Sequence, residues 1–347
     1  MIESSQQEQK EKQSNEVIAI ESLKKYYSAE SGLAGAIFSR SRNYIRAVDD
    51  VTFSIEKGRI LTLVGESGCG KTTVARCVIR LTEPTSGRIL FNGEDIFRSK
   101  GRASNAIRSK MQMIFQDPYG SLDSHNQIHS SVAEPLDSNP LFSNMKKDEK
   151  SDLIAKALDV VGLKPSEDYA SKYPGDLSGG QLQRVSIARA IVSNPEFIVA
   201  DEPTSMLDVS VRSKILNLLL ELREKFNLTY LMITHDLAMA RHISDQIAIM
   251  YLGKIVERGN SEDIVREPLH PYTQMLLQAS PTLAEGSEEK HAQATSLSNE
   301  VPNAINIPNG CRFNTRCPYA KENCFTLEPP LVEIKKDHYV ACHLLTA

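Results

Sequence analysis

The sequence predicts an α/β fold with a mostly parallel β-sheet. Three observations predict it: apolar, β-rich segments alternate with segments of helical periodicity, a glycine-rich loop directly follows one apolar segment, and two carboxylates end another. Strands that alternate with helices pair mainly in parallel, and such sheets bind ligands at the carboxyl ends of their strands. We therefore expect the functional residues at strand ends.

The first elements follow from local composition. Residues 17–23 and 48–55 alternate or cluster β-forming side chains, and residues 59–64 form a short apolar strand that runs directly into Gly65. A helix is predicted from Lys71 to about Leu81. Residues 28–46 contain glycines and several arginines, so this segment is predicted to be a surface loop.

The middle of the chain alternates in the same way. Residues 117–193 carry mostly helical periodicity with proline and serine breaks, which predicts a helical insert. Around the insert, the sequence predicts strands at 89–91, 111–115, 197–200, 230–234 and 246–251, and helices at 209–226 and 237–242. No internal repeat is visible, so one copy of this unit is expected.

Two polar segments lie outside this pattern. Residues 1–16 have almost no apolar side chain and are predicted to be a disordered tail. Residues 285–308 are predicted to be a linker that precedes a cysteine-rich end.

Composition excludes several classes of function. The chain has 347 residues, of which 41% are hydrophobic and 24% charged, as in a globular protein with a large core. A formal net charge of −4, without a basic, aromatic-rich block, argues against nucleic acid as a partner. The N-terminus is too polar for a secretory signal, and no run of 18 apolar residues could span a bilayer, so a cytosolic location is expected.

A phosphate-binding loop is predicted where the pattern GxxxxGK[ST] stands between a strand and a helix. Its residues are Gly65, Glu66, Ser67, Gly68, Cys69, Gly70, Lys71 and Thr72. Glycines let backbone N–H groups converge on phosphate oxygens, and the helix N-terminus adds positive potential. Lys71 would supply a mobile charge, Thr72 a hydroxyl for Mg²⁺ and Thr73 an α-phosphate contact. Cys69 is interpreted as a small filler.

A second motif is more specific. Leu177, Ser178, Gly179, Gly180 and Gln181 form LSGGQ, between the phosphate loop and the strand end at Asp201 and Glu202. Motifs in this order resemble the ATP-binding cassette (ABC) ATPases. The resemblance implies a P-loop NTPase (RecA-like) core with an antiparallel β subdomain and a helical subdomain, and ATP with Mg²⁺ as ligands. It also implies that LSGGQ closes over ATP held by a second subunit, so a dimer is expected.

The same resemblance assigns the hydrolytic residues. Asp201 would hold Mg²⁺, and Glu202 would orient and deprotonate the attacking water. A solvated acidic turn is the alternative. It is disfavoured because the sequence PTSMLD follows and resembles the D-loop, in which Asp208 would connect the two sites; Met206 replaces the usual alanine there.

Three further residues are assigned by order and spacing. His235 stands after a strand, where the family has its switch histidine, and would donate a hydrogen bond to the γ-phosphate. Gln116 resembles the Q-loop glutamine, which touches Mg²⁺ and the attacking water while the adjoining helical insert grips a membrane subunit. Tyr27 is the preferred ring to stack on adenine, with Tyr26 close behind, and core packing is the alternative for either.

The C-terminal third narrows the resemblance. The segments HPYT at 270–273, LL at 276–277, GCRF at 310–313 and RCP at 316–318 resemble the extension of oligopeptide/dipeptide importer ATPases. This implies a nucleotide-binding domain over residues 17–265, with its helical subdomain at about 117–193, and a C-terminal extension over residues 266–347.

Four of the six cysteines fall in the last 37 residues: Cys311, Cys317, Cys324 and Cys342. In a reducing cytosol such clustering favours metal or cluster ligation over disulfides. In the resembled family these cysteines bind an iron–sulfur cluster, and four thiolates suit [4Fe–4S]. Zinc is the alternative because four cysteines also satisfy tetrahedral Zn²⁺, and His338 and His343 lie close in sequence. The absence of a CxxC interval favours iron–sulfur, with free or disulfide-linked thiols as a third interpretation.

The resemblance implies an ATPase that energises peptide import from the cytoplasmic face of a membrane. Its expected partners are a second, distinct ATPase subunit in a heterodimer, two transmembrane permeases and an extracytoplasmic substrate-binding protein. Oligosaccharides or nickel are alternative cargoes within the family. A soluble ABC ATPase without permeases, or a redox- or metal-sensing regulator, are alternatives of other classes.

Overall fold

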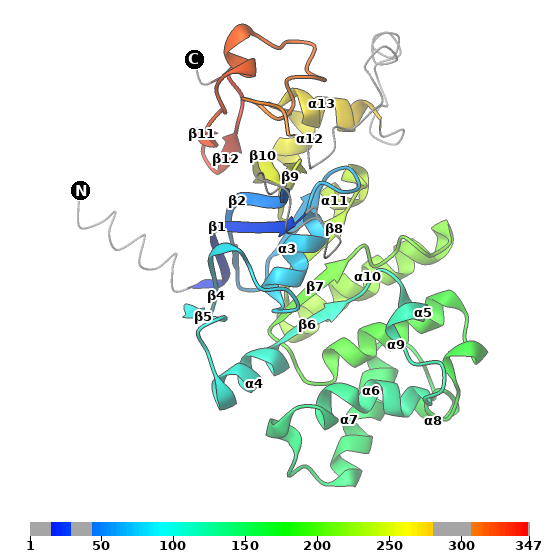
Figure 1. Ribbon diagram of the computed structural model, residues 1–347. Helices are drawn as coiled ribbons and strands as arrows, with labels where there is room; N and C mark the ends of the chain where they lie inside the picture. The colour runs from blue at the N-terminus through cyan, green and yellow to red at the C-terminus, as the bar shows by residue number, and fades with distance from the viewer. Residues whose placement is uncertain (1–14, 29–43, 280–306, 346–347) are drawn as a thin grey trace, which may run out of the picture. The chain divides into compact units, whose positions relative to one another are not determined.

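A computed structural model describes residues 15–28, 44–279 and 307–345, which divide into two compact units (Figure 1). Of the described residues, the phosphate-loop unit contains those in 19–54, 60–89 and 233–345. The helical unit contains those in 15–18, 55–59 and 90–232.

The larger sheet of the phosphate-loop unit has the strand order β11-β12-β10-β9-β3. The strands are β3 (Ile60–Val64), β9 (Gln246–Tyr251), β10 (Lys254–Asn260), β11 (Val332–Lys335) and β12 (His338–Val340). β3 and β9 are parallel, with Val64 opposite Ile249, whereas β9, β10, β12 and β11 pair antiparallel. Every residue of β3 is buried, as its largely apolar sequence predicts, and its carboxyl end leads into the glycine-rich loop.

The phosphate-loop unit also contains short helices and a buried aromatic cluster. The helices are α3 (Lys71–Val78), α11 (Leu237–Ile243), α12 (Ser261–Arg266), α13 (Pro271–Gln278) and the 3₁₀ turn η5 (Glu322–Phe325). Tyr251 from β9, Tyr272 from α13 and Phe313 meet in one buried cluster, with the Tyr251 and Tyr272 ring centroids 4.6 Å apart. The C-terminal residues therefore share a core with the strand that neighbours β3.

A second sheet is formed by longer strands in the order β2-β1-β4. They are β1 (Glu16–Ser28), β2 (Tyr44–Glu56) and β4 (Ser86–Phe91), and the short β5 (Glu94–Asp95) pairs antiparallel with the end of β4. β2 alternates buried Val51, Phe53 and Ile55 with less buried neighbours, so one face of this strand is apolar.

The helical unit contains β6 (Met111–Ile114) and β7 (Phe197–Asp201), which are parallel, and the first four residues, 229–232, of the buried strand β8 (Thr229–Thr234). Its helices are α4 (Gly101–Lys110), α5 (Pro118–Ser121), α6 (Ile128–Asp137), α7 (Lys147–Val160), α8 (Ser166–Ala170), α9 (Gly179–Ile191) and α10 (Val209–Phe226), with 3₁₀ turns η1 (Pro140–Phe142) and η2 (Pro174–Asp176). The helix α9 contacts α5, α6 and α7, which gather around it in Figure 1.

Most predicted elements are confirmed. The predicted strands and the helices at 209–226 and 237–242 are present, whereas the helix predicted to reach Leu81 ends at Val78, because Arg80 adopts a left-handed backbone. The structure adds α4 and β10, which the sequence analysis missed because their charged residues interrupt the apolar pattern. The short, largely exposed β11 was missed for the same reason.

Three predicted segments fall largely outside the described residues. The tail predicted at 1–16 is described only at residues 15 and 16, and the linker predicted at 285–308 only at its last two residues. Of the loop predicted at 28–46, the two ends belong to β1 and β2, and residues 29–43 lie outside the description.

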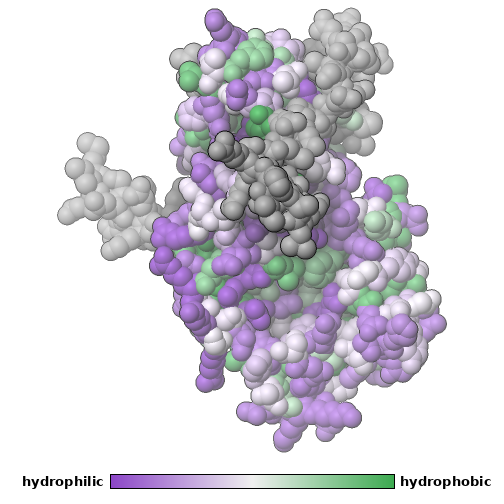
Figure 2. Space-filling model, in the orientation of Figure 1, coloured by the Kyte–Doolittle hydropathy of each residue, from purple (hydrophilic) through white to green (hydrophobic). Residues whose placement is uncertain are grey.

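In the described part of the chain, no helix combines the length and apolar character that a bilayer span requires. The face visible in Figure 2 is mainly hydrophilic, with hydrophobic residues in small groups.

Candidate functional site

The glycine-rich loop is fixed between β3 and α3 by close backbone approaches. A Cβ atom on Gly65 would lie 2.2 Å from the Met250 carbonyl oxygen, and one on Gly70 would lie 2.1 Å from the Ala47 carbonyl oxygen. Gly70 also has φ of 110°, in the left-handed region that favours glycine. The Gly253 N–H donates to the Cys69 carbonyl at 2.8 Å. Glycine is therefore required at positions 65 and 70 by the shape of the loop.

Lys71 is held inside this loop. Its side chain is buried, and its Nζ donates to the carbonyl oxygens of Gly65 at 2.6 Å and Glu66 at 3.0 Å. Because Lys71 also begins α3, a full charge and a helix N-terminus coincide, which suits a phosphate group. Burial raises the pKa of the neighbouring Cys69 thiol, which fits a filler and not a nucleophile.

The predicted acidic strand end lies in the helical unit. Asp201 ends β7 with 4% of its surface exposed, and Glu202 follows with a left-handed φ of 44°. A left-handed backbone at a residue other than glycine costs about 1 kcal/mol or more and is concentrated at functional sites. Gln116, just beyond β6, donates from Nε2 to Glu202 Oε2 at 3.2 Å. The structure therefore brings together two residues predicted to handle the attacking water.

The LSGGQ residues form the start of α9. Ser178 Oγ accepts the Gln181 N–H at 3.4 Å and Gln181 Oε1 accepts the Ser178 N–H at 2.9 Å, a reciprocal capping box. Gly179 and Gly180 make the first turn, and a Cβ atom on Gly180 would lie 2.7 Å from Val211 Cγ1 on α10. Ser178 is exposed, so the N-terminus of a 13-residue helix is open to a ligand supplied from outside the unit.

The remaining predicted residues are at exposed element boundaries. His235 follows β8 and is exposed, and Asp208 is exposed immediately before α10. Met206 and Val209, on either side of Asp208, are 60% and 78% exposed. Thr72 and Thr73 are half-buried in the first turn of α3.

The two candidate tyrosines differ in their surroundings. Tyr27 is 37% exposed, with the Lys25 ammonium 5.0 Å from its ring centroid. The Tyr26 hydroxyl donates to Asp49, and burial together with this hydrogen bond raises the pKa of Tyr26 to about 12. Tyr27 is therefore the ring that has a face available to a ligand.

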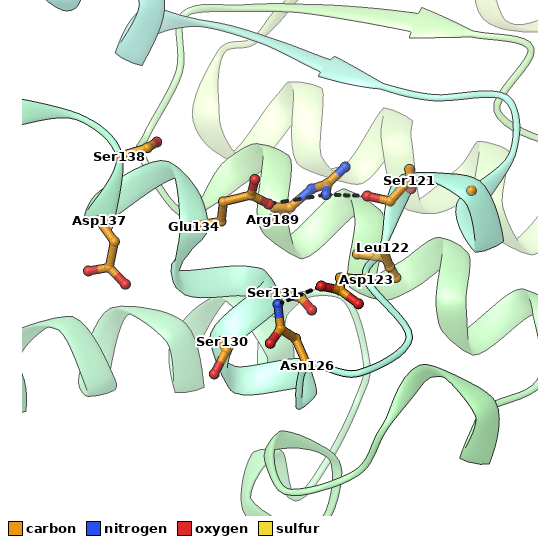
Figure 3. Close-up of a pocket in the computed structure, with 11 residues that line it drawn as sticks. Ser121, Leu122, Asp123, Asn126, Ser130, Ser131, Glu134, Asp137, Ser138 and Arg189 are labelled. Carbon is orange, nitrogen blue, oxygen red and sulfur yellow. Dashed lines mark hydrogen bonds and ion pairs between the residues drawn. The ribbon is translucent and has the colours of Figure 1, made fainter.

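The helical unit also contains an open, polar pocket of about 730 Å³ beside α6 and α9 (Figure 3). Arg189 reaches into it, donating to the Ser121 carbonyl at 2.6 Å and lying 3.5 Å from Glu134 Oε2. Asp123 and Asp137 add acidic groups to its lining. The first lining residues of the pocket, from Gly120 onward, come shortly after Gln116 in sequence, so α5 connects Gln116 to the pocket.

In the described residues the four C-terminal cysteines form no disulfide, and they lie close enough to influence one another electrostatically. Burial, with contributions from the other three, raises the pKa of Cys311 to about 11. In the described ranges, no group of three or more His, Cys, Asp or Glu side chains is arranged to hold a metal ion. The nearby imidazoles are engaged elsewhere: His338 Nε2 lies 2.7 Å from Glu257 Oε1, and His343 Nε2 lies 2.8 Å from the Leu327 carbonyl oxygen.

A buried carboxylate explains the HPYT segment, and the sequence analysis missed it. Glu257 on β10 has no exposed surface, and it accepts the N–H groups of Leu269 at 2.8 Å and His270 at 2.9 Å besides its contact with His338. His270 Nδ1 in turn accepts the Tyr272 N–H at 3.0 Å and caps α13. The available signal was weak: Glu257 directly follows the apolar pair Ile255 and Val256, but Arg258 comes next.

This buried histidine predicts an acid sensitivity. Burial lowers the pKa of His270 to about 4. An unfolded histidine has a pKa near 6.5, so the unfolded chain binds more protons, and the free energy of unfolding falls by up to about 3 kcal/mol as pH drops from 6.5 to 4. His270→Asn keeps a capping acceptor but cannot titrate. We expect denaturant unfolding of this variant to depend less on pH across that window; an equally steep dependence would contradict the assignment.

Comparisons with known proteins show which families the chain resembles. Residues 48–205 match the family described as ABC transporter, and residues 256–324 match the family described as oligopeptide/dipeptide transporter, C-terminal region. The chain is 44% identical over 329 residues to the oligopeptide transport ATP-binding protein AppF of Bacillus subtilis, covering 94% of this chain and 97% of that one. It is 41% identical over 310 residues to the dipeptide transport ATP-binding protein DppF of Escherichia coli, covering 89% of each.

Solved structures are similar as well. One is the ATP-binding cassette MJ0796, a dimer in a post-hydrolysis state bound to ADP and phosphate, with a TM-score of 0.60 and 28% identity over 70% of this chain and 98% of that one. Another is cbiO1 from Clostridium perfringens, with a TM-score of 0.60 and 26% identity over 73% of this chain and 92% of that one.

Proposed function

Because the chain belongs to the family of ATP-binding subunits of oligopeptide and dipeptide ABC transporters, in which ATP hydrolysis is coupled to transport, we propose that it drives peptide uptake through membrane permeases. The observation that carries this proposal is the pairing of Gln116 with Glu202 at the end of β7, in a chain that also has a complete phosphate loop. Both parts are needed for hydrolysis, and neither is needed for binding a partner alone.

Nucleotide binding is assigned to the phosphate-loop residues, with Lys71 and Thr73 on the phosphates and Tyr27 against adenine. Thr72, Gln116 and Asp201 would hold Mg²⁺, and these oxygen donors fit a hard cation. When bound, Mg²⁺ would neutralise charge on the β- and γ-phosphates. The exposed ring of Tyr27 supports its assignment to adenine, and the buried charge of Lys71 supports its assignment to the phosphates.

Hydrolysis is assigned to Glu202 as the general base. Gln116, 3.2 Å from its carboxylate, would orient that carboxylate toward the water, and Glu202 would take the water's proton. His235, exposed at the end of β8, would donate a hydrogen bond to the γ-phosphate as charge develops there.

The proposed active form is a dimer of cassettes, and we favour a heterodimer with a similar but distinct ATPase. Ser178 to Gln181 would contact the nucleotide of the partner through the exposed N-terminus of α9. The exposed Met206 and Val209 beside Asp208 support a contact surface at this place, because two large apolar side chains that flank a functional turn gain from being covered.

The polar pocket beside α6 and α9 is proposed as the contact for a permease. Its connection to Gln116 through α5 offers a route between the hydrolysis site and a membrane subunit. This would place the chain at the cytoplasmic face of the membrane, beside two permeases served by an extracytoplasmic substrate-binding protein.

Iron–sulfur binding by the four cysteines of the C-terminal extension is a separate proposal, with zinc as its alternative. The four cysteines form no disulfide, their side chains influence one another electrostatically, and both nearby imidazoles are engaged, which favours an all-cysteine ligand set. Side-chain rearrangement would be needed to bring the thiols into ligand positions. Anaerobic purification should yield iron and sulfide with visible absorption; stoichiometric zinc without iron would contradict the proposal.

Uptake measurements test the function. Deletion of the gene should abolish uptake of labelled di- and oligopeptides, and wild-type protein should restore it, whereas Lys71→Ala should not. Intact peptide uptake, with a loss confined to oligosaccharides or nickel, would overturn peptide as the cargo.

A further inference from the structure

The C-terminal extension contacts the phosphate loop directly. Arg316 donates from Nη1 to Glu66 Oε2 at 2.8 Å and from Nη2 to Glu66 Oε1 at 3.0 Å. Glu66 is the second residue of the phosphate loop, and the two residues are 250 positions apart in sequence. Two parallel bonds between a guanidinium and a carboxylate form a directional, charge-assisted pair.

A second contact fixes the backbone of the same residue. The Glu66 N–H donates to the Tyr272 hydroxyl at 3.0 Å. Tyr272 has no exposed surface, and its ring packs against Phe313 with centroids 5.4 Å apart. Both the side chain and the amide of Glu66 are therefore held by residues of the extension.

Arg316 is itself held firmly. Its side chain is 7% exposed, and its guanidinium lies 5.8 Å from the Tyr251 ring centroid and 5.9 Å from that of Phe313. The bonds to Glu66 raise the pKa of Arg316, so its guanidinium stays charged at every physiological pH. An anchored arginine of this kind can set the position of its partner.

The charge of Glu66 makes the pair relevant to nucleotide. An unpaired carboxylate in a loop that binds a triphosphate would repel it, and Arg316 neutralises that carboxylate. Lys71 Nζ donates to the carbonyl oxygens of Gly65 and Glu66, so the segment held by the extension also positions the loop lysine. We propose that Arg316 and Tyr272 are positioning residues for nucleotide binding, acting through Glu66, so that the C-terminal extension is a working part of the ATP site.

The test is ATP hydrolysis by the full-length chain in its assembled complex. Arg316→Met should raise the KM for ATP about tenfold and leave kcat within about twofold. Adding Glu66→Gln removes the unpaired carboxylate, so the double variant should recover to within about threefold of the wild-type KM. Arg316→Lys, which keeps the charge and loses the fork, should raise KM less than Arg316→Met. Unchanged KM in Arg316→Met, or a double variant as poor as Arg316→Met, would overturn the proposal.

Two further variants separate positioning from stability. Lys335→Met removes an exposed ion pair with Glu267 in the same extension, far in sequence from the loop, and should leave KM unchanged. Tyr272→Phe conserves core volume and removes only the hydroxyl, so it should fold and raise KM about threefold even if Arg316→Met does not fold. An unchanged KM in Tyr272→Phe would remove Tyr272 from the proposal.

The positioning role of Arg316 and Tyr272 rests on the proposed ATPase function, and different results would overturn each of them. Absence of ATP turnover in both the wild-type complex and Lys335→Met would overturn the function. Turnover in both, with a wild-type KM in Arg316→Met, would overturn only the role of the extension.

Discussion

Glu202→Gln should bind ATP about as well as the wild-type protein and hydrolyse it about 10²- to 10⁴-fold more slowly. The amide keeps the shape of the side chain and can still contact Gln116, but it cannot accept the proton of the attacking water. With hydrolysis blocked, ATP-bound dimer should accumulate. Phosphate release and size-exclusion chromatography with ATP measure the two effects.

Glu196→Gln is the matched control. Glu196 lies just before β7, and its carboxylate pairs with Lys110 and accepts from Asn92 at the partly exposed start of the strand. Loss of such a pair changes stability by at most about 1 kcal/mol and should leave turnover nearly intact. Near-normal turnover in Glu202→Gln would remove this residue from the role of base.

Gly70→Ala should weaken ATP binding about 10- to 100-fold in a chain that remains folded. The left-handed φ of 110° and the 2.1 Å approach of a Cβ atom to the Ala47 carbonyl oxygen force the backbone of the loop to move. Strain of about 1–3 kcal/mol corresponds to that loss of affinity. The affinity for ATP is measured by displacing a bound fluorescent ATP analogue with increasing concentrations of ATP.

Gly68→Ala separates the two causes. Gly68 has a φ of 79°, but a Cβ atom there meets nothing within 4 Å among the described residues. We expect a loss of affinity smaller than that of Gly70→Ala, because only the backbone preference is violated. Equal losses would show that steric contact with Ala47 is irrelevant.

Local patterns predicted the parts of the site that are built from neighbours in sequence. The apolar segment followed by glycines predicted a loop between a strand and a helix, which the structure has between β3 and α3, whereas LSGGQ was assigned by resemblance and its capping box is seen only in the structure. Glu202 was predictable because an apolar strand ended in acids. Each of these features lies within one strand–turn–helix segment, where spacing alone determines contact.

The contacts of the C-terminal extension could not be predicted in this way. Glu66 and Arg316 are 250 residues apart, and neither lies in an alternating or helical pattern that would indicate its partner. Glu257 on β10 contacts His338 on β12. Both strands are short and lack a regular apolar alternation, so the sequence did not predict them. Pairings of this kind depend on strand order and core packing, which composition and spacing do not specify.

The most direct test of the central claim, that ATP is hydrolysed between two subunits, is the site-by-site turnover of Ser178→Arg paired with its partner ATPase. One pair would carry a hydrolysis-dead partner, so that only the nucleotide on Lys71 can turn over; the other would carry Glu202→Gln in this chain, so that only the partner's nucleotide can. Ser178→Arg should stop turnover in the second pair and spare it in the first. Loss confined to the nucleotide on Lys71 would contradict the account.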